Sequence, residues 1–414
     1  MAKIHYREIE GNSINYYILL GFFAVIIAIA LAATYYMEHN GHHVTGMTNQ
    51  IVWGMPHVFA VFLIVAASGA LNVASIASVF GKTAYKPLAP LSGLVAIALL
   101  IGGLSVLVLD LGRPDRLIVA MTEYNFKSIF AWNIFLYNGF LIIVGVYLWM
   151  MMEHRMNKYS KAVGFAAFIW RLILTTGTGS IFGFLVARQG YDAAIMAPMF
   201  ILMSFSFGMA IFILILMASY AGTGRPLGTA VLYRLKNLLG VFVAAVLLIV
   251  AIYHLTNLYA TEHHEFEQFI LLNGGIYTFL FWGVQILLGS LIPLFLLYSP
   301  ATRESALWIT ISCILVITGG LAQMYGIIIG GQAFPLNMFP GFEVSSSFFD
   351  GVVTHYSPSL PEIALGIGGV AIALIMVTIA IKVLRFLPLS LDNAIVDPHY
   401  KPATEETAKS EATA

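Results

Sequence analysis

Long apolar runs separated by short polar segments make up most of this chain. A run of about 20 apolar residues is long enough to cross the hydrocarbon core of a bilayer as a helix. The pattern therefore predicts an all-α integral membrane protein with about ten transmembrane helices. The predicted spans are 15–36, 52–80, 88–110, 129–152, 162–188, 194–220, 237–260, 271–297, 304–331 and 361–386.

The distribution of basic residues predicts how these spans are oriented. With an even number of spans, both termini lie on the same side. Most of the 20 Lys and Arg residues then fall on the side of the termini, and the opposite loops hold only Arg113, Arg116, Lys127 and Arg188. Because basic loops stay in the cytoplasm, we expect a multi-pass protein of the bacterial inner (cytoplasmic) membrane. Residues 1–14 would be a cytoplasmic N-terminus, 15–386 the membrane domain and 387–414 a disordered cytoplasmic tail.

The composition agrees with a membrane protein and limits the cofactors and metal sites that the chain could hold by itself. The 414 residues are 60% hydrophobic and 10% charged, with a formal net charge of +0, which gives no reason to expect a nucleic-acid partner. The single cysteine, Cys313, can form no internal disulfide and cannot alone hold an iron–sulfur cluster or a zinc site. The histidine clusters "HNGHH" and "EHHEF" are loosely spaced, so we expect no metal site. Any electrons must therefore arrive through a partner or a diffusible carrier.

The loop that breaks the positive-inside pattern is also the most charged one. The stretch "LDLGRPDRLIVAMTEYNFK" at 109–127 holds Asp110, Arg113, Asp115, Arg116, Glu123 and Lys127. Positive charge kept on the unfavoured side indicates a local role. The alternative is a loop whose charges simply balance one another.

Polar side chains inside the spans are few, and most of them fall in the outer half of the membrane. Ionisable groups inside a membrane are expensive, so each is a functional candidate. Trp132 lies beside them at the start of the fourth span. The outer group consists of His57, Asp110, Arg113, Asn133, His254 and Tyr325.

This outer group has the chemistry that a quinone requires. A quinone keeps its apolar ring and tail in lipid, while its two oxygens need hydrogen-bond donors and proton exchange near neutral pH. His57 is the natural titrating group. Asp110 can relay protons, or it can hold Arg113 in a salt bridge. For each residue, a structural polar contact between helices is the competing interpretation.

Arg171 lies apart from this group, in the middle of the fifth span. It can be a step in a proton path, or it can pair with backbone carbonyls or extend toward the cytoplasmic surface. His57 and His254 also allow haem b ligation, but b-type haem proteins usually contain more paired histidines. A secondary transporter is a further alternative, although its site should lie near the midplane rather than at one edge.

Several motifs resemble the NrfD/polysulfide-reductase family of membrane subunits. "LDLGRPDR" at 109–116 followed by "NFKSIFAW" at 125–132 is similar to the family signature, in which an LGRP-like loop precedes an S-x-x-x-W helix start. "WGMPHVFAVFLIVAASGA" at 53–70 is similar to the family's first core helix. The segments "FWGVQILLGSLIPL" and "YGIIIGGQ" match later family segments, so the resemblance covers roughly 50–390.

The resemblance implies a fold, a function and partners. The fold would be two four-helix bundles, at about 52–188 and 194–331, with the first and last helices flanking them. The chain would exchange electrons between menaquinone or ubiquinone and a periplasmic ferredoxin-like iron–sulfur subunit, linked to further catalytic or cytochrome subunits, without a cofactor of its own. Carried over by position, the quinone-binding candidates are His57, Asp110, Arg113, Trp132 and Asn133, while Arg116 and Lys127 would contact the partner. With ten spans, the chain resembles the branch of the family that contains the membrane subunits of a periplasmic [NiFe] hydrogenase and of the sulfite-reduction-associated Dsr complex. The resemblance to the sulfite-reduction-associated branch is the closer one.

The sequence also departs from the family pattern. The family often has a histidine within the segment that reads "TTGTGS" here, and a Trp-His pair where this chain has Tyr191 and Asp192. An arginine is common near the position of Gln323. A proton route through those family residues would therefore not apply to this chain.

Overall fold

The computed structural model describes residues 4–335 and 351–397. Within these ranges it contains ten helices that are long and apolar enough to cross a membrane, which confirms the predicted number. The helical spans run Ile14–Asn40, Met55–Ser78, Thr83–Leu109, Ile129–Met152, Asn157–Gly183, Met196–Thr223, Thr229–Tyr259, Ile276–Tyr298, Ala306–Ala333 and Leu360–Val383.

Some spans consist of more than one helical element. The main helices are α1 (Ile14–Asn40), α2 (Met55–Ala70), α3 (Asn72–Ser78), α4 (Ala89–Leu109), α6 (Ile129–Met152), α7 (Ser160–Gly183), α8 (Met196–Thr223), α9 (Thr229–Tyr259), α12 (Ile292–Tyr298), α13 (Ala306–Tyr325) and α15 (Leu360–Val383). Short helices lie in the connections or at span ends: α5 (Leu117–Thr122), α10 (His264–Gln268), α11 (Ile276–Phe279), α14 (Gly331–Ala333) and α16 (Asn393–Val396). The eighth span contains a π-helical segment, Leu280–Leu291, between α11 and α12.

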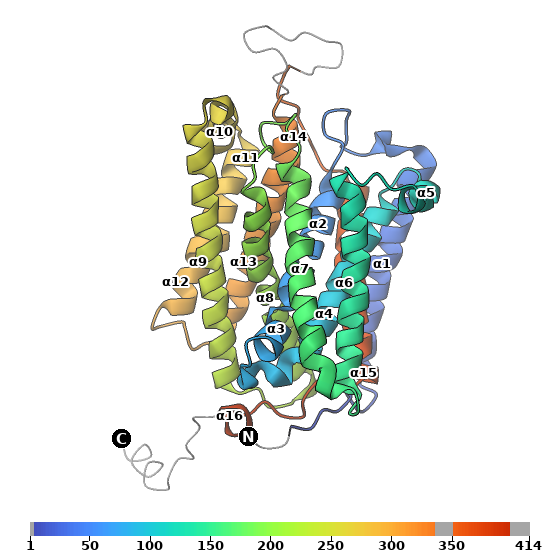
Figure 1. Ribbon diagram of the computed structural model, residues 1–414, viewed down its shortest axis with the longest axis vertical. Coiled ribbons are helices and arrows are strands. Elements are labelled where there is room, and N and C mark those ends of the chain that lie inside the picture. Colours follow the sequence, from blue (N-terminus) through green and yellow to red (C-terminus); the bar gives the residue numbers. More distant parts are fainter. Residues whose placement is uncertain (1–3, 336–350, 398–414) are drawn as a thin grey trace.

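The helices form two four-helix bundles, as the resemblance implied (Figure 1). We call α2 with α3, α4, α6 and α7 the first bundle. The second bundle consists of α8, α9, the eighth span (α11 to α12) and α13. Helix α8 also packs on α2 and α7, which joins the bundles. Helix α15 covers α4 and α2, and α1 packs on α15 at the periphery.

Close backbone approach holds the two bundles together. Gly69 of α2 faces Gly208 of α8, and a Cβ atom at Gly208 would lie 2.1 Å from the Ala70 nitrogen. Small residues at helix crossings allow such approach in membranes, where dispersion contacts replace the hydrophobic effect between helices. The α2–α8 contact is therefore a central structural constraint of the fold.

The segment before α1, the loop between α8 and α9 and the segment after α15 meet at one end of the bundles. Tyr6 pairs with Pro388, and Leu227 pairs with Leu391. We call the opposite end, where α5, α10 and α14 lie in Figure 1, the distal end. Residues 387–397 differ from the predicted disordered tail, because Leu387, Leu391 and Val396 are buried. The rest of that predicted tail, 398–414, lies outside the described residues.

Hydrogen bonds to two buried side chains hold the distal segments in place. Gln332 accepts hydrogen bonds from the backbone nitrogens of Val52 and Trp53, at 2.9 and 3.0 Å, just before α2. Glu362 accepts from Gly46 N at 2.8 Å and from the Tyr356 hydroxyl at 2.6 Å. These contacts fix the chain that leads into the first turn of α2.

We expect Gly208→Ala to destabilise the protein, because the added methyl group must push α2 and α8 apart. Overpacking of this kind costs about 1–3 kcal/mol, and thermal unfolding of the solubilised protein would show a lower midpoint. The matched control is Gly145→Ala in α6, where a Cβ atom meets nothing within 4 Å. Equal midpoints for the two variants would contradict the close crossing.

Candidate functional site

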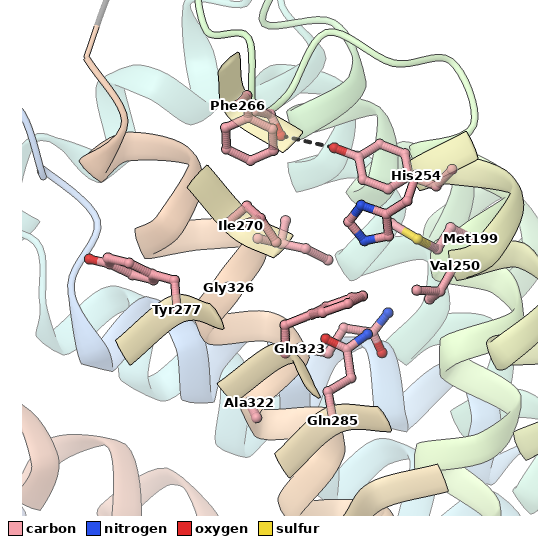
Figure 2. Close-up of a pocket in the computed structure, with 14 residues that line it drawn as sticks. Met199, Val250, His254, Phe266, Ile270, Tyr277, Gln285, Ala322, Gln323 and Gly326 are labelled. Atoms are coloured by element: carbon pink, nitrogen blue, oxygen red, sulfur yellow. Dashed lines mark hydrogen bonds between the residues drawn. The ribbon is translucent and has the colours of Figure 1, made fainter. Parts of the chain in front are cut away.

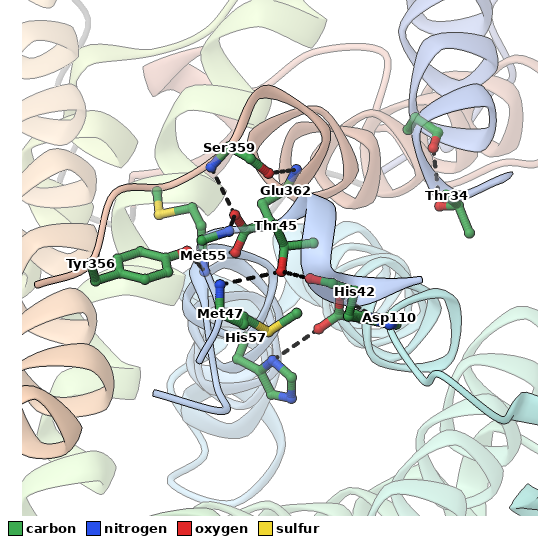
Figure 3. Close-up of polar contacts among 12 residues, drawn as sticks. Thr34, His42, Thr45, Met47, Met55, His57, Asp110, Tyr356, Ser359 and Glu362 are labelled. Carbon is green, nitrogen blue, oxygen red and sulfur yellow. Dashed lines mark hydrogen bonds and ion pairs between the residues drawn. The ribbon is translucent and has the colours of Figure 1, made fainter. Parts of the chain in front are cut away.

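A histidine and a carboxylate meet at the distal end of the first bundle. His57 lies in the first turn of α2, and Asp110 is the residue that caps the C-terminus of α4. Because α2 and α4 are antiparallel neighbours, the start of one helix meets the end of the other. His57 Nδ1 lies 3.1 Å from Asp110 Oδ2, and His42 Nε2 lies 4.0 Å from Asp110 Oδ1 (Figure 3).

The Asp110 carboxylate and the Nδ1 atom of His57 are buried but lack well-aligned hydrogen bonds. The Asp110 side chain is 2% exposed, and neither of its oxygens has a well-aligned hydrogen-bond donor among the described residues. His57 Nδ1 likewise lacks a well-aligned partner in the same part of the chain. Asp110 also sits at a helix C-terminus, where the helix dipole disfavours negative charge. Since buried polar groups without hydrogen bonds are costly, the pair favours a ligand that brings an O–H group or exchanges a proton.

Aromatic and apolar side chains surround the pair. Trp53 stacks on His57 with ring centroids 6.3 Å apart, and it also contacts Phe130, Phe182 and Tyr191. Exposed apolar residues continue outward from the loop and from α5, which projects sideways at the distal end (Figure 1). They include Val108, Leu111, Ile118, Val119, Phe126 and Trp132. An apolar molecule in the lipid therefore has an apolar surface leading toward His57 and Asp110.

The remaining candidates from the charged loop do not join this pair. Arg113 is exposed and pairs with Asp115 at 3.1 Å, so the alternative that it pairs with Asp110 is wrong. This local pairing lowers the pKa of Asp115 through a hydrogen bond and raises the pKa of Arg113 for the same reason. The Trp132 indole is half exposed and donates to the Phe126 carbonyl at 2.9 Å. Arg116 and Lys127 are exposed on the distal surface.

Asn133 and Arg171 make contacts within the first bundle. Asn133 is buried and donates to the Gly177 carbonyl at 3.1 Å, which ties α6 to α7. Arg171 is buried, donates to the Ser68 carbonyl at 3.2 Å and lies 5.0 Å from the Phe168 ring. The interpretation that Arg171 pairs with a backbone carbonyl is therefore confirmed. No contact between described residues joins Arg171 to Asp110.

His254 belongs to a separate cluster in the second bundle. Its Nδ1 lies 2.6 Å from Glu267 Oε2, and Asn257 donates to Glu267 Oε1 at 2.8 Å. Glu267 is 0% exposed. Sequence analysis missed Glu267, which directly follows the histidine cluster "EHHEF". A signal was available, since His263, Phe266, Glu267 and Ile270 have the spacing of one helical face, and all four are buried.

A cavity lies beside this second cluster. It contains about 490 Å³ of empty space, part of it open to the outside, and His254, Tyr277, Gln285 and Gln323 are among its lining residues (Figure 2). Tyr325 does not line it but packs on Tyr277, with ring centroids 6.0 Å apart. The predicted site residues thus divide between two bundles rather than forming one pocket.

Comparison with known proteins agrees with this fold. Residues 43–336 match the model of the polysulphide reductase, NrfD, family, so the chain belongs to this family of membrane proteins. It is 28% identical to the Hdr-like menaquinol oxidoreductase integral membrane subunit of Archaeoglobus fulgidus, over 93% of this chain and 97% of that one.

Two further relatives align over most of the chain. A putative dimethyl sulfoxide reductase membrane subunit of Halobacterium salinarum is 26% identical, over 89% of this chain and 91% of that one. The menaquinone reductase integral membrane subunit of Nitratidesulfovibrio vulgaris is 21% identical, over 94% of this chain and 96% of that one. The narrower resemblance to the sulfite-reduction-associated branch stays a prediction.

We expect Glu267→Ala to lower stability strongly, because it leaves His254 and Asn257 without their buried partner. Removing one member of a buried pair costs about 3–5 kcal/mol. The control is Glu265→Ala on the same short helix, where the side chain is exposed. Thermal unfolding should separate the two variants clearly, and a Glu267→Ala midpoint equal to that of the control would show that the pair is not formed.

Proposed function

We propose that this chain is the quinone-reactive membrane subunit of a multi-subunit oxidoreductase complex. The observation that carries the proposal is the incompletely hydrogen-bonded His57–Asp110 pair, with a buried carboxylate, next to an apolar surface. The names of two relatives support it, since one is a menaquinol oxidoreductase subunit and the other a menaquinone reductase subunit. Menaquinone or ubiquinone would be the substrate.

The chemistry of quinol oxidation fits the groups present. A quinol that becomes a quinone loses two electrons and two protons. His57 would accept the proton of one quinol hydroxyl and, once that proton has moved on through Asp110, the proton of the other, as imidazole does near neutral pH. Asp110, beside it, would hold the imidazole and pass the proton on. The electrons would leave to an iron–sulfur partner, and quinone reduction would be the same steps in reverse.

The partner would dock on the distal end, close to this site. The distribution of basic residues indicates that the distal end faces the outside of a bacterial inner membrane, with both termini in the cytoplasm. Electron transfer requires a short distance between the quinone and a cluster of the partner. A periplasmic ferredoxin-like iron–sulfur subunit on the distal surface would satisfy this, and further catalytic or cytochrome subunits would bind to it. Arg116 and Lys127 would contact its acidic residues.

The proposed proton path begins at Asp110 and includes Arg171. Asp110 belongs to the proposed site, and we keep Arg171 as a candidate further along the path. Its side chain is buried in the first bundle with Ser68 and Thr175 nearby: the Thr175 hydroxyl lies 2.6 Å from the Ser68 hydroxyl. These hydroxyls would carry protons only if water connected them to Asp110.

We expect His57→Ala and Asp110→Asn to reduce quinol turnover by the intact complex. General acid–base groups contribute about 10²–10⁴-fold to rates, so the loss should reach at least about 100-fold. The assay would follow quinol oxidation by membranes containing the complex, with a soluble electron acceptor. The matched controls are His39→Ala and Glu123→Gln, both exposed. Parental rates in fully assembled His57→Ala and Asp110→Asn complexes would mean that the site is misplaced.

We expect reversal of both charges in Arg116→Glu/Lys127→Glu to weaken attachment of the iron–sulfur subunit. Charges at an interface mainly set the rate of association and its salt dependence, and we expect an effect of about tenfold. Co-purification across a salt series would measure the attachment. Arg155→Glu/Lys158→Glu, exposed at the opposite end, is the control. Retention equal to the control at every salt concentration would place the partner elsewhere.

A further inference from the structure

We infer that the second bundle carries a second binding site for a quinone-type ring, in the cavity between His254 and the carboxamides of Gln285 and Gln323. This inference rests on the proposed function in one respect, namely that quinones are the molecules this chain meets in the membrane. It concerns a different place, because most of the lining residues come from α8, α9, α10 and the eighth and ninth spans. None of the lining residues belongs to α2 or α4, which hold His57 and Asp110.

The cavity has the walls of a site for a flat apolar ring. Aromatic side chains make up much of the wall: Tyr253, Phe266, Tyr277 and Phe281. Aromatic walls favour planar ligands, because rings pack on one another through offset or edge-to-face contacts.

A fixed histidine supplies a polar group at one side of the cavity. Glu267 engages Nδ1 of His254, and Asn257 holds the second oxygen of Glu267. The imidazole is therefore oriented by a buried carboxylate. Its Nε2 has no hydrogen bond to any residue in the described ranges. This nitrogen would accept from a quinol hydroxyl when the ring is neutral, or donate to a quinone carbonyl when it is protonated.

Two carboxamides supply polar groups on the other side. Gln285 and Gln323 are 8% and 4% exposed, and both line the cavity. Figure 2 shows both of them below the His254 ring. A side-chain amide that faces a cavity can donate through its NH₂ group, so these groups suit a ligand with an acceptor oxygen. Gln285 lies in the π-helical segment Leu280–Leu291, and such widened turns occur often at functional sites.

The positions of His254, the two carboxamides and the aromatic wall favour one class of ligand. An acyl chain of a lipid would leave His254 Nε2 and both carboxamides without partners. A ring with an oxygen at each end would satisfy both sides while its faces contact the aromatic wall. Quinones and quinols have this shape. Water filling the cavity is the competing occupant, and it forms one outcome of the test below.

The test is photolabelling of the intact complex in membranes with an azido-naphthoquinone, followed by mass spectrometry of the labelled peptides. We expect labelled peptides from residues 250–285, and we expect excess unlabelled naphthoquinone to abolish that labelling. His254→Phe and Gln323→Leu should each reduce it by about tenfold, as expected for the loss of one or two hydrogen bonds. Gln268→Leu is the matched control, since Gln268 is exposed beside Glu267.

The two proposals fail in different ways in this experiment. Labelling of residues 104–116 reports on the His57–Asp110 site, and His57→Ala should remove only that labelling. If residues 250–285 are not labelled, or if their labelling resists competition, the second site is overturned and water is the occupant. The same holds if labelling survives His254→Phe and Gln323→Leu together. If only residues 250–285 are labelled, the second site stands and the proposed placement of the first site fails.

Discussion

The structure depends on one constraint: inside a hydrocarbon phase, a polar group has to find its hydrogen-bond partner within the protein. Among the residues that the structure describes, most buried polar groups meet it. The Lys236 ammonium donates to the Leu297 carbonyl at the end of α12, at 2.6 Å. Asn133 and Ser68 bind backbone carbonyls of neighbouring helices. These contacts, together with the glycine crossing of α2 and α8, determine how the helices pack.

Two places in the structure have polar side chains that a ligand could engage. His57 and Asp110 meet each other but leave hydrogen-bonding capacity unused, and the carboxamides of Gln285 and Gln323 line the cavity of the second bundle. Both places lie next to aromatic side chains, and each combines a histidine with a carboxylate. A subunit that handles quinones needs such groups, because a quinone brings oxygens into lipid and exchanges protons there.

Much of the fold follows from the sequence, and less of the site does. The ten spans could be predicted because long apolar runs leave few alternatives. The proximity of His57 and Asp110 follows from a span that begins and a span that ends at the same side. Arg113 was misplaced because its partner is Asp115, two residues away, and a local pair competes with a distant one. Glu267 was missed because charge in a loop normally indicates exposure, whereas α10 turns this residue inward.

The measurement that tests the central claim most directly is an experimental structure of the intact complex with a bound quinol analogue. The account predicts that a head-group oxygen lies within about 2.6–3.2 Å of His57 or Asp110, at the distal end of the first bundle. An analogue bound elsewhere, with His57 and Asp110 in contact only with each other and no ligand beside them, would contradict the account.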